Sequence, residues 1–81
     1  MAKSLHTPEY EFFTLLLVQA REQVGLTQSE VSARLGQPQS FVAKYEGGER
    51  RLDLIEFIQV STALGVDAHA IFIQVQARVA T

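Results

Sequence analysis

All five glycines of this 81-residue chain stand where a helix-forming stretch ends. Glycine is the residue that most often follows the last turn of a helix. After each of these ends, a residue that favours a helix start follows closely; the pairs are Gly25 and Thr27, Gly36 and Pro38, Gly47-Gly48 and Asp53, and Gly65 and Asp67. The sequence therefore predicts an all-α domain of five short helices and no strand.

Capping residues set the expected helix boundaries. Thr7-Pro8-Glu9 suits the first turn of a helix, because a hydroxyl caps it, proline fits its first position and an acidic group favours its dipole. Two capping boxes mark further starts, at Thr27 with Glu30 and at Asp53 with Glu56. We expect helices at residues 8–24, 28–35, 38–46, 54–64 and 68–79, within one domain at 8–80 that follows a flexible N-terminus at 1–6.

Composition narrows the class of protein. The apolar share of 47% is ample for a core and indicates a partner surface as well. The chain has no cysteine, so disulfides and thiolate metal sites are excluded. Its longest apolar run, at 15–18, is far shorter than the roughly 20 residues of a membrane span, and no signal peptide precedes it. We expect a soluble, cytoplasmic protein with no membrane partner.

The charges are distributed unevenly. The net charge is −2, which by itself does not indicate a polyanion partner. From residue 34 to residue 51, however, four cations face two anions, whereas the rest of the chain carries three cations and seven anions. The middle of the chain is its basic part, and this asymmetry permits DNA binding there.

Two short helices in the middle of the chain have the spacing of a helix-turn-helix. The expected helices at 28–35 and 38–46 are joined by a tight turn at Gly36-Gln37, so the motif spans 28–46. Val31 and Leu35 on the first helix are expected to pack against Val42 and Tyr45 on the second, and the small Ser32 lets the two helices approach closely.

The string from 25 to 48 resembles the phage-repressor-like helix-turn-helix family, often called XRE. It reads Gly25-Leu26-Thr27-Gln28-Ser29-Glu30-Val31-Ser32-Ala33-Arg34-Leu35-Gly36, then Gln39-Ser40-Phe41-Val42-Ala43-Lys44-Tyr45-Glu46-Gly47-Gly48. Ala63-Leu64-Gly65-Val66 matches the end of that family's fourth helix, so the likeness covers about Arg21 to Phe72. The resemblance implies a five-helix, phage-repressor-like DNA-binding domain of a transcriptional regulator.

The resemblance also implies which residues contact the bases of double-stranded DNA. The helix at 38–46 would lie in the major groove and present Gln39, Ser40 and Lys44 to base edges. Glutamine pairs bidentately with adenine, lysine donates to guanine, and serine is permissive. For Phe41 two alternatives stay open, contact with a thymine methyl group and burial in the core or a dimer interface.

Further residues would hold the DNA backbone or the fold. Gln28, with the free N–H groups at the start of its helix, would bind a phosphate. Arg50 and Arg51 would contact the backbone or enter a minor groove. In this family an arginine near the end of the first helix pairs with the glutamate that closes the third, and Arg21 and Glu46 stand at the matching positions. Solvated helix surface is the alternative interpretation for the exposed residues.

The sequence gives no sign of an enzyme. It has no phosphate-binding glycine-rich loop, no cysteine nucleophile and no histidine-rich ligand set. His6 and His69 are far apart in the sequence and are expected to be solvated. We therefore expect no catalytic residues, no metal, no cofactor and no small-molecule ligand.

A single module of this size binds DNA weakly, so we expect a homodimer on a palindromic operator, with half-sites about 34 Å apart or a multiple of it. It would regulate by occupancy, as a repressor in the first instance, although an activator stays open. The candidate dimer contacts are Phe12, Leu15, Leu16, Ile71, Ile73, Val75 and Val79. The alternative function is a protein-interaction module, such as an antitoxin or assembly domain, and a restriction–modification or phage operon is a further context for a regulator.

Overall fold

The computed structural model describes residues 7–80, which form five helices and no strand. The helices are α1 (Pro8–Gln23), α2 (Gln28–Arg34), α3 (Ser40–Glu46), α4 (Leu54–Leu64) and α5 (Ala68–Ala80). The predicted all-α, five-helix fold is therefore confirmed. The flexible N-terminus expected at 1–6 lies outside the described residues.

The helix starts carry the predicted caps. The Thr7 hydroxyl accepts a hydrogen bond from the Tyr10 backbone N–H at the start of α1. Both capping boxes are formed, that of α2 by Thr27 with Glu30 and that of α4 by Asp53 with Glu56. Gly36 ends the α2 turn with a φ of 67°, in the left-handed region where a residue with a side chain is strained.

One helix start differs from the prediction, and the ends of the first, second and fifth helices each differ by one residue. The third helix begins at Ser40 rather than at Pro38, because residues 38–41 first form a turn in which the Phe41 backbone N–H donates to the Pro38 carbonyl over 2.9 Å. Gln39 precedes the helix and offers no side-chain cap of its own. The free backbone N–H groups in the first turn of α3 must therefore find their hydrogen-bond acceptors elsewhere in the fold.

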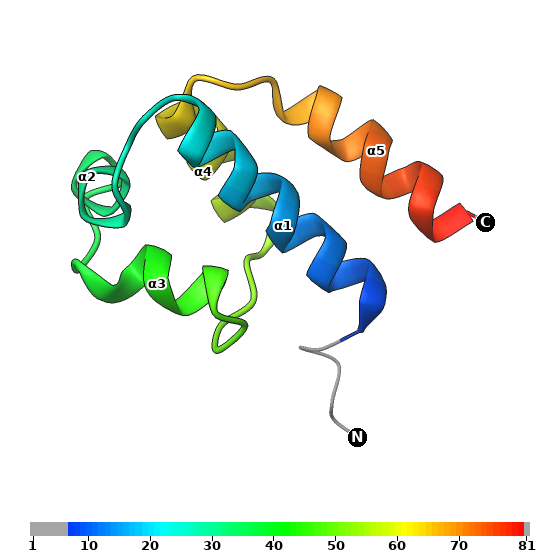
Figure 1. The fold of residues 1–81 in the computed structure, drawn as a ribbon, viewed down its shortest axis with the longest axis horizontal. Coiled ribbons are helices and arrows are strands. Elements are labelled where there is room, and N and C mark those ends of the chain that lie inside the picture. Colours follow the sequence, from blue (N-terminus) through cyan, green and yellow to red (C-terminus); the bar gives the residue numbers. More distant parts are fainter. Residues whose placement is uncertain (1–6, 81) are drawn as a thin grey trace.

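Helix α1 runs through the middle of the molecule, with α3 on one side of it and α5 on the other (Figure 1). It packs against α4 as well, while α2 packs against α3 and α4. The short helices α2 and α3 thus lie at one end of the fold, supported from behind by α1 and α4. This arrangement leaves one side of α3 facing outward.

The core lies where these helices meet. Its most completely buried apolar side chains are Leu17, Val31, Val42, Tyr45 and Val60. As predicted, Val31 of α2 joins Val42 and Tyr45 of α3 in this cluster, with Leu35 packed against it. The Tyr45 hydroxyl has no hydrogen-bond partner among the described residues, and burial raises its pKa.

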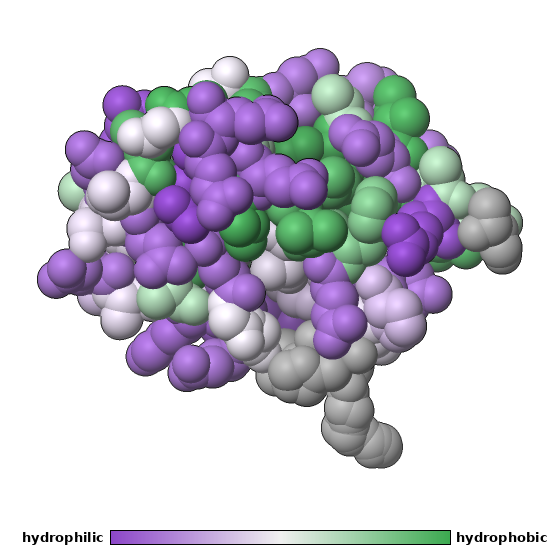
Figure 2. All heavy atoms as spheres, in the orientation of Figure 1, coloured by the Kyte–Doolittle hydropathy of each residue, from purple (hydrophilic) through white to green (hydrophobic). Residues whose placement is uncertain are grey.

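Polar and apolar surfaces are segregated. In Figure 2 the surface over α2 and α3 is largely hydrophilic, whereas a hydrophobic patch lies over α1 and α5. Large apolar side chains are also exposed on the first turns of α4, where Leu54 is 66% and Ile55 61% exposed. No helix within residues 7–80 has the length and apolar character that a membrane crossing requires.

Candidate nucleic-acid interface

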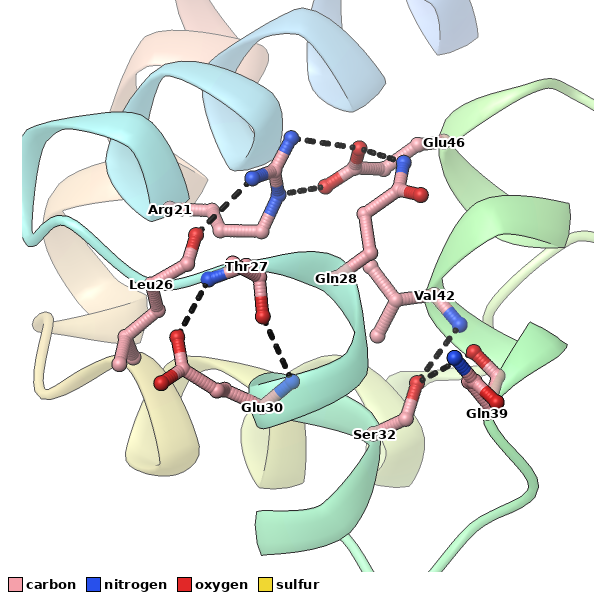
Figure 3. Close-up of polar contacts among 9 residues, drawn as sticks. All are labelled: Arg21, Leu26, Thr27, Gln28, Glu30, Ser32, Gln39, Val42 and Glu46. Atoms are coloured by element: carbon pink, nitrogen blue, oxygen red, sulfur yellow. Dashed lines mark hydrogen bonds and ion pairs between the residues drawn. The ribbon is translucent and has the colours of Figure 1, made fainter.

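Ser32 of α2 supplies the cap that α3 lacks. Its side chain is fully buried, and its hydroxyl oxygen accepts a hydrogen bond from the Val42 backbone N–H over 3.2 Å (Figure 3). The same hydroxyl donates to the Gln39 carbonyl over 3.3 Å. From the sequence we predicted only that the small size of Ser32 lets the two helices approach, and we missed the capping role of the hydroxyl. A hydroxyl on the inner face of α2, opposite a helix start without a capping residue, was the available signal.

Arg21 and Glu46 form the expected pair. Arg21 Nε lies 2.7 Å from Glu46 Oε2 and Nη2 lies 3.1 Å from Oε1 (Figure 3). The guanidinium therefore donates two parallel hydrogen bonds to the carboxylate. Nη1 also donates to the Leu26 carbonyl over 2.9 Å. Only 14% of the Arg21 side chain and 6% of the Glu46 side chain are exposed. Hydrogen bonding to Glu46 raises the pKa of Arg21, and the two bonds tie α1 to the end of α3.

Gln28 joins this pair rather than pointing freely outward. Its Nε2 donates to Glu46 Oε1 over 2.8 Å, and the residue is half-buried. A carboxamide nitrogen carries two hydrogens, so one remains available at the start of α2. The residue expected to hold a phosphate therefore also couples that helix start to the Arg21–Glu46 pair.

The outward face of α3, together with the residue just before the helix, carries the three polar residues expected to read bases. Gln39, Ser40 and Lys44 are all exposed, and Gln39 Nε2 donates to the Ser29 hydroxyl over 2.9 Å. Ala43 is exposed on the same helix, between Ser40 and Lys44. Sequence reasoning overlooked Ala43, although its position three residues after Ser40 places it on the same helix face.

Phe41 does not belong to this face. Only 8% of the residue is exposed, its ring packs edge-to-face with Tyr45 at 5.7 Å, and the Arg50 guanidinium lies 5.0 Å from the ring centre. The core face of α3 is wide enough to hold Phe41, Val42 and Tyr45 together. The expected contact with a thymine methyl group is wrong for Phe41, because the protein's own side chains cover the ring, and the core alternative is correct.

Arg50 is held against α4. Its Nη2 lies 2.6 Å from Glu56 Oε2 and its Nη1 lies 3.0 Å from Glu56 Oε1, with 41% of the arginine side chain exposed. Hydrogen bonding to Arg50, and then to the Asp53 backbone N–H, lowers the pKa of Glu56. The residue expected to contact DNA thus also fixes the loop between α3 and α4.

Arg51 is exposed and lies against α1. Its guanidinium stacks over the Tyr10 ring at 4.3 Å, while the Tyr10 hydroxyl accepts from the Leu52 backbone N–H over 2.9 Å. These contacts dock the 50–52 segment on the first turn of α1. Within residues 7–80, no three histidine, cysteine or acidic side chains are grouped so that they could hold a metal ion.

The chain matches known proteins in the same region. The model of the Helix-turn-helix family matches residues 17–71. Among solved structures, an XRE-family like protein from Pseudomonas syringae pv. tomato str. DC3000 shares 46% identity and superimposes with a TM-score of 0.83, over 86% of this chain and 85% of that one. No curated protein matches the chain.

Two restriction-modification controller proteins have the same fold. C.AhdI from Aeromonas hydrophila is 25% identical, with a TM-score of 0.72 over 80% of this chain and 98% of that one. C.Esp1396I is 13% identical, with a TM-score of 0.79 over 94% of this chain and 100% of that one, and it shows likeness of fold alone. Together with the family match, these findings place the chain in the XRE-type helix-turn-helix family of DNA-binding transcriptional regulators.

Proposed function

We propose that this regulator reads a specific DNA sequence by laying α3 in the major groove. The observation that carries the proposal is the outward face formed by Gln39, Ser40, Ala43 and Lys44. The Arg21–Glu46 pair and the Ser32 cap hold α3 from behind, so these side chains stand on a helix of fixed orientation. A rigid helix that presents polar side chains to solvent is suited to direct readout of base edges.

Each residue of this face has a distinct role in the proposal. Gln39 pairs with adenine, and Lys44 donates to guanine. Ser40 is compatible with either base. Ala43, rather than Phe41, packs against a thymine methyl group, because it is a small apolar side chain exposed in the middle of this face.

The backbone contacts come from the edges of the same surface. Gln28 and the first backbone N–H groups of α2 bind one phosphate, since the start of a helix favours an anion. Arg50 and Arg51 bind the backbone beyond the end of α3, because Arg51 is exposed and 41% of the Arg50 side chain reaches solvent. These contacts set register and orientation but carry no sequence information.

We further propose that two copies bind a palindromic site. Leu54, Ile55 and Ile58 of α4 and Phe72 of α5 are exposed. An exposed apolar surface of this kind is typical of an interface between subunits. Of the dimer contacts expected from the sequence, Leu15, Ile73 and Val79 are also exposed, whereas Ile71 is buried and belongs to the core.

The experiment that tests DNA reading is selection from a random duplex library at low salt, using the full chain. We expect the retained sequences to share a palindrome with half-sites about 34 Å apart or a multiple of it. The matched control is the double variant Gln39→Ala, Lys44→Ala, which removes two exposed side chains and should lose the enrichment while it stays folded. Retention of no preferred sequence by the wild-type chain would contradict the proposal and favour the protein-interaction alternative.

Sedimentation of the free protein tests the second copy. Ile58→Asp places a charge on the exposed apolar surface and should shift the chain toward monomer, whereas Gln59→Asp, at an exposed polar position on the same helix, should not. A dimer that is equally stable in both variants would place the interface elsewhere.

The likeness to C.AhdI, a restriction-modification controller protein, supports one genetic setting for this regulator. In that setting the selected palindrome would lie upstream of genes for a DNA methyltransferase and an endonuclease. Mapping the palindrome onto the chromosome around the gene tests it, and a palindrome found only beside unrelated genes would exclude this setting while leaving the DNA-reading proposal intact.

A further inference from the structure

Gln39 is held by α2 at both its ends. Its backbone carbonyl accepts from the Ser32 hydroxyl over 3.3 Å, and its side-chain Nε2 donates to the Ser29 hydroxyl over 2.9 Å. Ser29 and Gln39 are both exposed; Ser29 lies in α2, and Gln39 is the residue just before α3. The amide therefore reaches solvent with one of its donors already used.

This contact decides what the amide offers to a ligand. A carboxamide has two N–H hydrogens and one carbonyl oxygen, and the hydrogen bond to Ser29 takes one of the hydrogens. One donor and one acceptor remain. In the major groove adenine presents an acceptor, N7, beside a donor, the N6 amino group, whereas guanine presents two acceptors, N7 and O6. The remaining pair on Gln39 matches adenine and mismatches guanine.

The structure directs the side chain of the nearby Gln28 elsewhere. Gln28 turns its Nε2 toward Glu46 and belongs to the pair that closes α3. Ser29 is thus the side chain of α2 that holds the Gln39 amide. Without the Ser29 hydroxyl, the amide is free to rotate by half a turn and to offer both hydrogens outward, the pattern that suits guanine.

We propose that Ser29 is a positioning residue that fixes the Gln39 amide for adenine and so sets the preference for adenine over guanine at one base pair of each half-site. This inference rests on the proposed reading of DNA by α3. It adds to that function a specificity determinant that does not touch the base itself.

Competition binding on a selected duplex tests the inference. The diagnostic base pair is the one at which Gln39→Ala abolishes the preference of the full chain. There, Ser29→Ala should lower the ratio of affinities for adenine over guanine by about two- to tenfold, the range expected when one side chain loses its fixed rotamer. Its affinity for random DNA should change less than this ratio does.

Three controls separate positioning from general loss of structure. Ser29→Thr keeps the hydroxyl, so the ratio of affinities for adenine over guanine should return to the wild-type value. Thr62→Ala removes an exposed hydroxyl from α4, where it bonds only to the Ile58 carbonyl, and should leave the ratio unchanged. In the double variant with Gln39→Ala, removal of the Ser29 hydroxyl should have no further effect, because the amide that it positions is gone.

The outcomes distinguish this inference from the function on which it rests. An unchanged ratio in Ser29→Ala, or a wild-type preference for guanine at the diagnostic pair, overturns the inference while leaving DNA reading intact. Retention of no preferred duplex by the wild-type chain overturns both. A lowered ratio that Ser29→Thr restores supports the positioning role.

Discussion

The Ser32 hydroxyl on α2 accepts a hydrogen bond from the backbone N–H of Val42 on α3 over 3.2 Å, in the fully buried seam between the two helices. A helix start is usually capped by the side chain just before it, but Gln39 in that position makes no such bond. The cap of α3 therefore comes from the neighbouring helix. The Ser32 oxygen belongs to α2 but bonds to a backbone N–H of α3. This bond therefore sets the angle between the two helices of the motif.

Ser32→Ala should lower the free energy of unfolding by about 1–2 kcal/mol, because it removes a cap and leaves the buried Val42 N–H without a partner. The substitution adds no atoms, so no clash obscures the effect. Urea denaturation measures it. Thr62→Ala, which removes an exposed hydroxyl, is the control, and an equal loss in the two variants would contradict the capping role.

Arg21→Ala should be more damaging. It leaves Glu46 almost buried beside Gln28 with its charge unpaired, and we expect a loss of about 2–4 kcal/mol in the free energy of unfolding. Arg21→Lys should fall in between, since an ammonium group cannot reproduce the two parallel bonds. The comparison is Arg34→Ala, which removes an exposed arginine with a single bond to the Ala63 carbonyl. If thermal unfolding shows no difference between Arg21→Ala and Arg34→Ala, the pair does not hold α3.

The capping carboxylates should make stability fall in acid. Hydrogen bonds from Arg50 and the Asp53 backbone lower the pKa of Glu56, and the Thr27 backbone N–H lowers the pKa of Glu30. In the unfolded chain both groups titrate at their ordinary value of about 4.3. As the pH falls through that value the unfolded state takes up protons first, so stability that is complete at neutral pH is lost below about pH 5.

The double variant Glu30→Gln, Glu56→Gln tests this dependence, because glutamine keeps an acceptor oxygen but does not titrate. It should be less stable than the wild type at pH 7, and its stability should fall less steeply between pH 5 and pH 3. Denaturation curves at a series of pH values give the two slopes. Parallel curves would show that other carboxylates cause the acid sensitivity.

Base and backbone contacts should differ in how their loss affects DNA binding. Lys44→Ala should reduce discrimination at one base pair by about 1–3 kcal/mol, because lysine is proposed to donate to one guanine. Arg51→Ala should weaken binding to all sequences and should lower the salt dependence of binding by about one counterion. Titrations on selected and random duplexes at several salt concentrations separate the two patterns. Equal losses on both duplexes for Lys44→Ala would rule out base reading by that residue.

The sequence alone was enough to predict the five helices and the family to which the chain belongs. Caps and glycines are local signals, since a hydroxyl or carboxylate three residues before its partner acts within one helical turn. The box at Thr27 and Glu30 and the box at Asp53 and Glu56 therefore formed as predicted. The pair of Arg21 and Glu46 was available through the family resemblance, because local spacing does not relate residues on different helices.

Tertiary packing alone decided the orientation of individual side chains. Phe41 and Ala43 lie on the same short helix, yet the first is buried and the second exposed, because α1 and the loop at Arg50 approach α3 from one side only. Ser32 became a cap, and Arg50 joined Glu56, through contacts between segments that the chain brings together only on folding. Periodicity assigns apolar residues to a helix face, but the width of the buried face depends on the neighbouring helices. The sequence therefore predicted where the helices lie along the chain, apart from the start of α3, and the packing of those helices determined which side chains remain exposed on the face that is proposed to meet DNA.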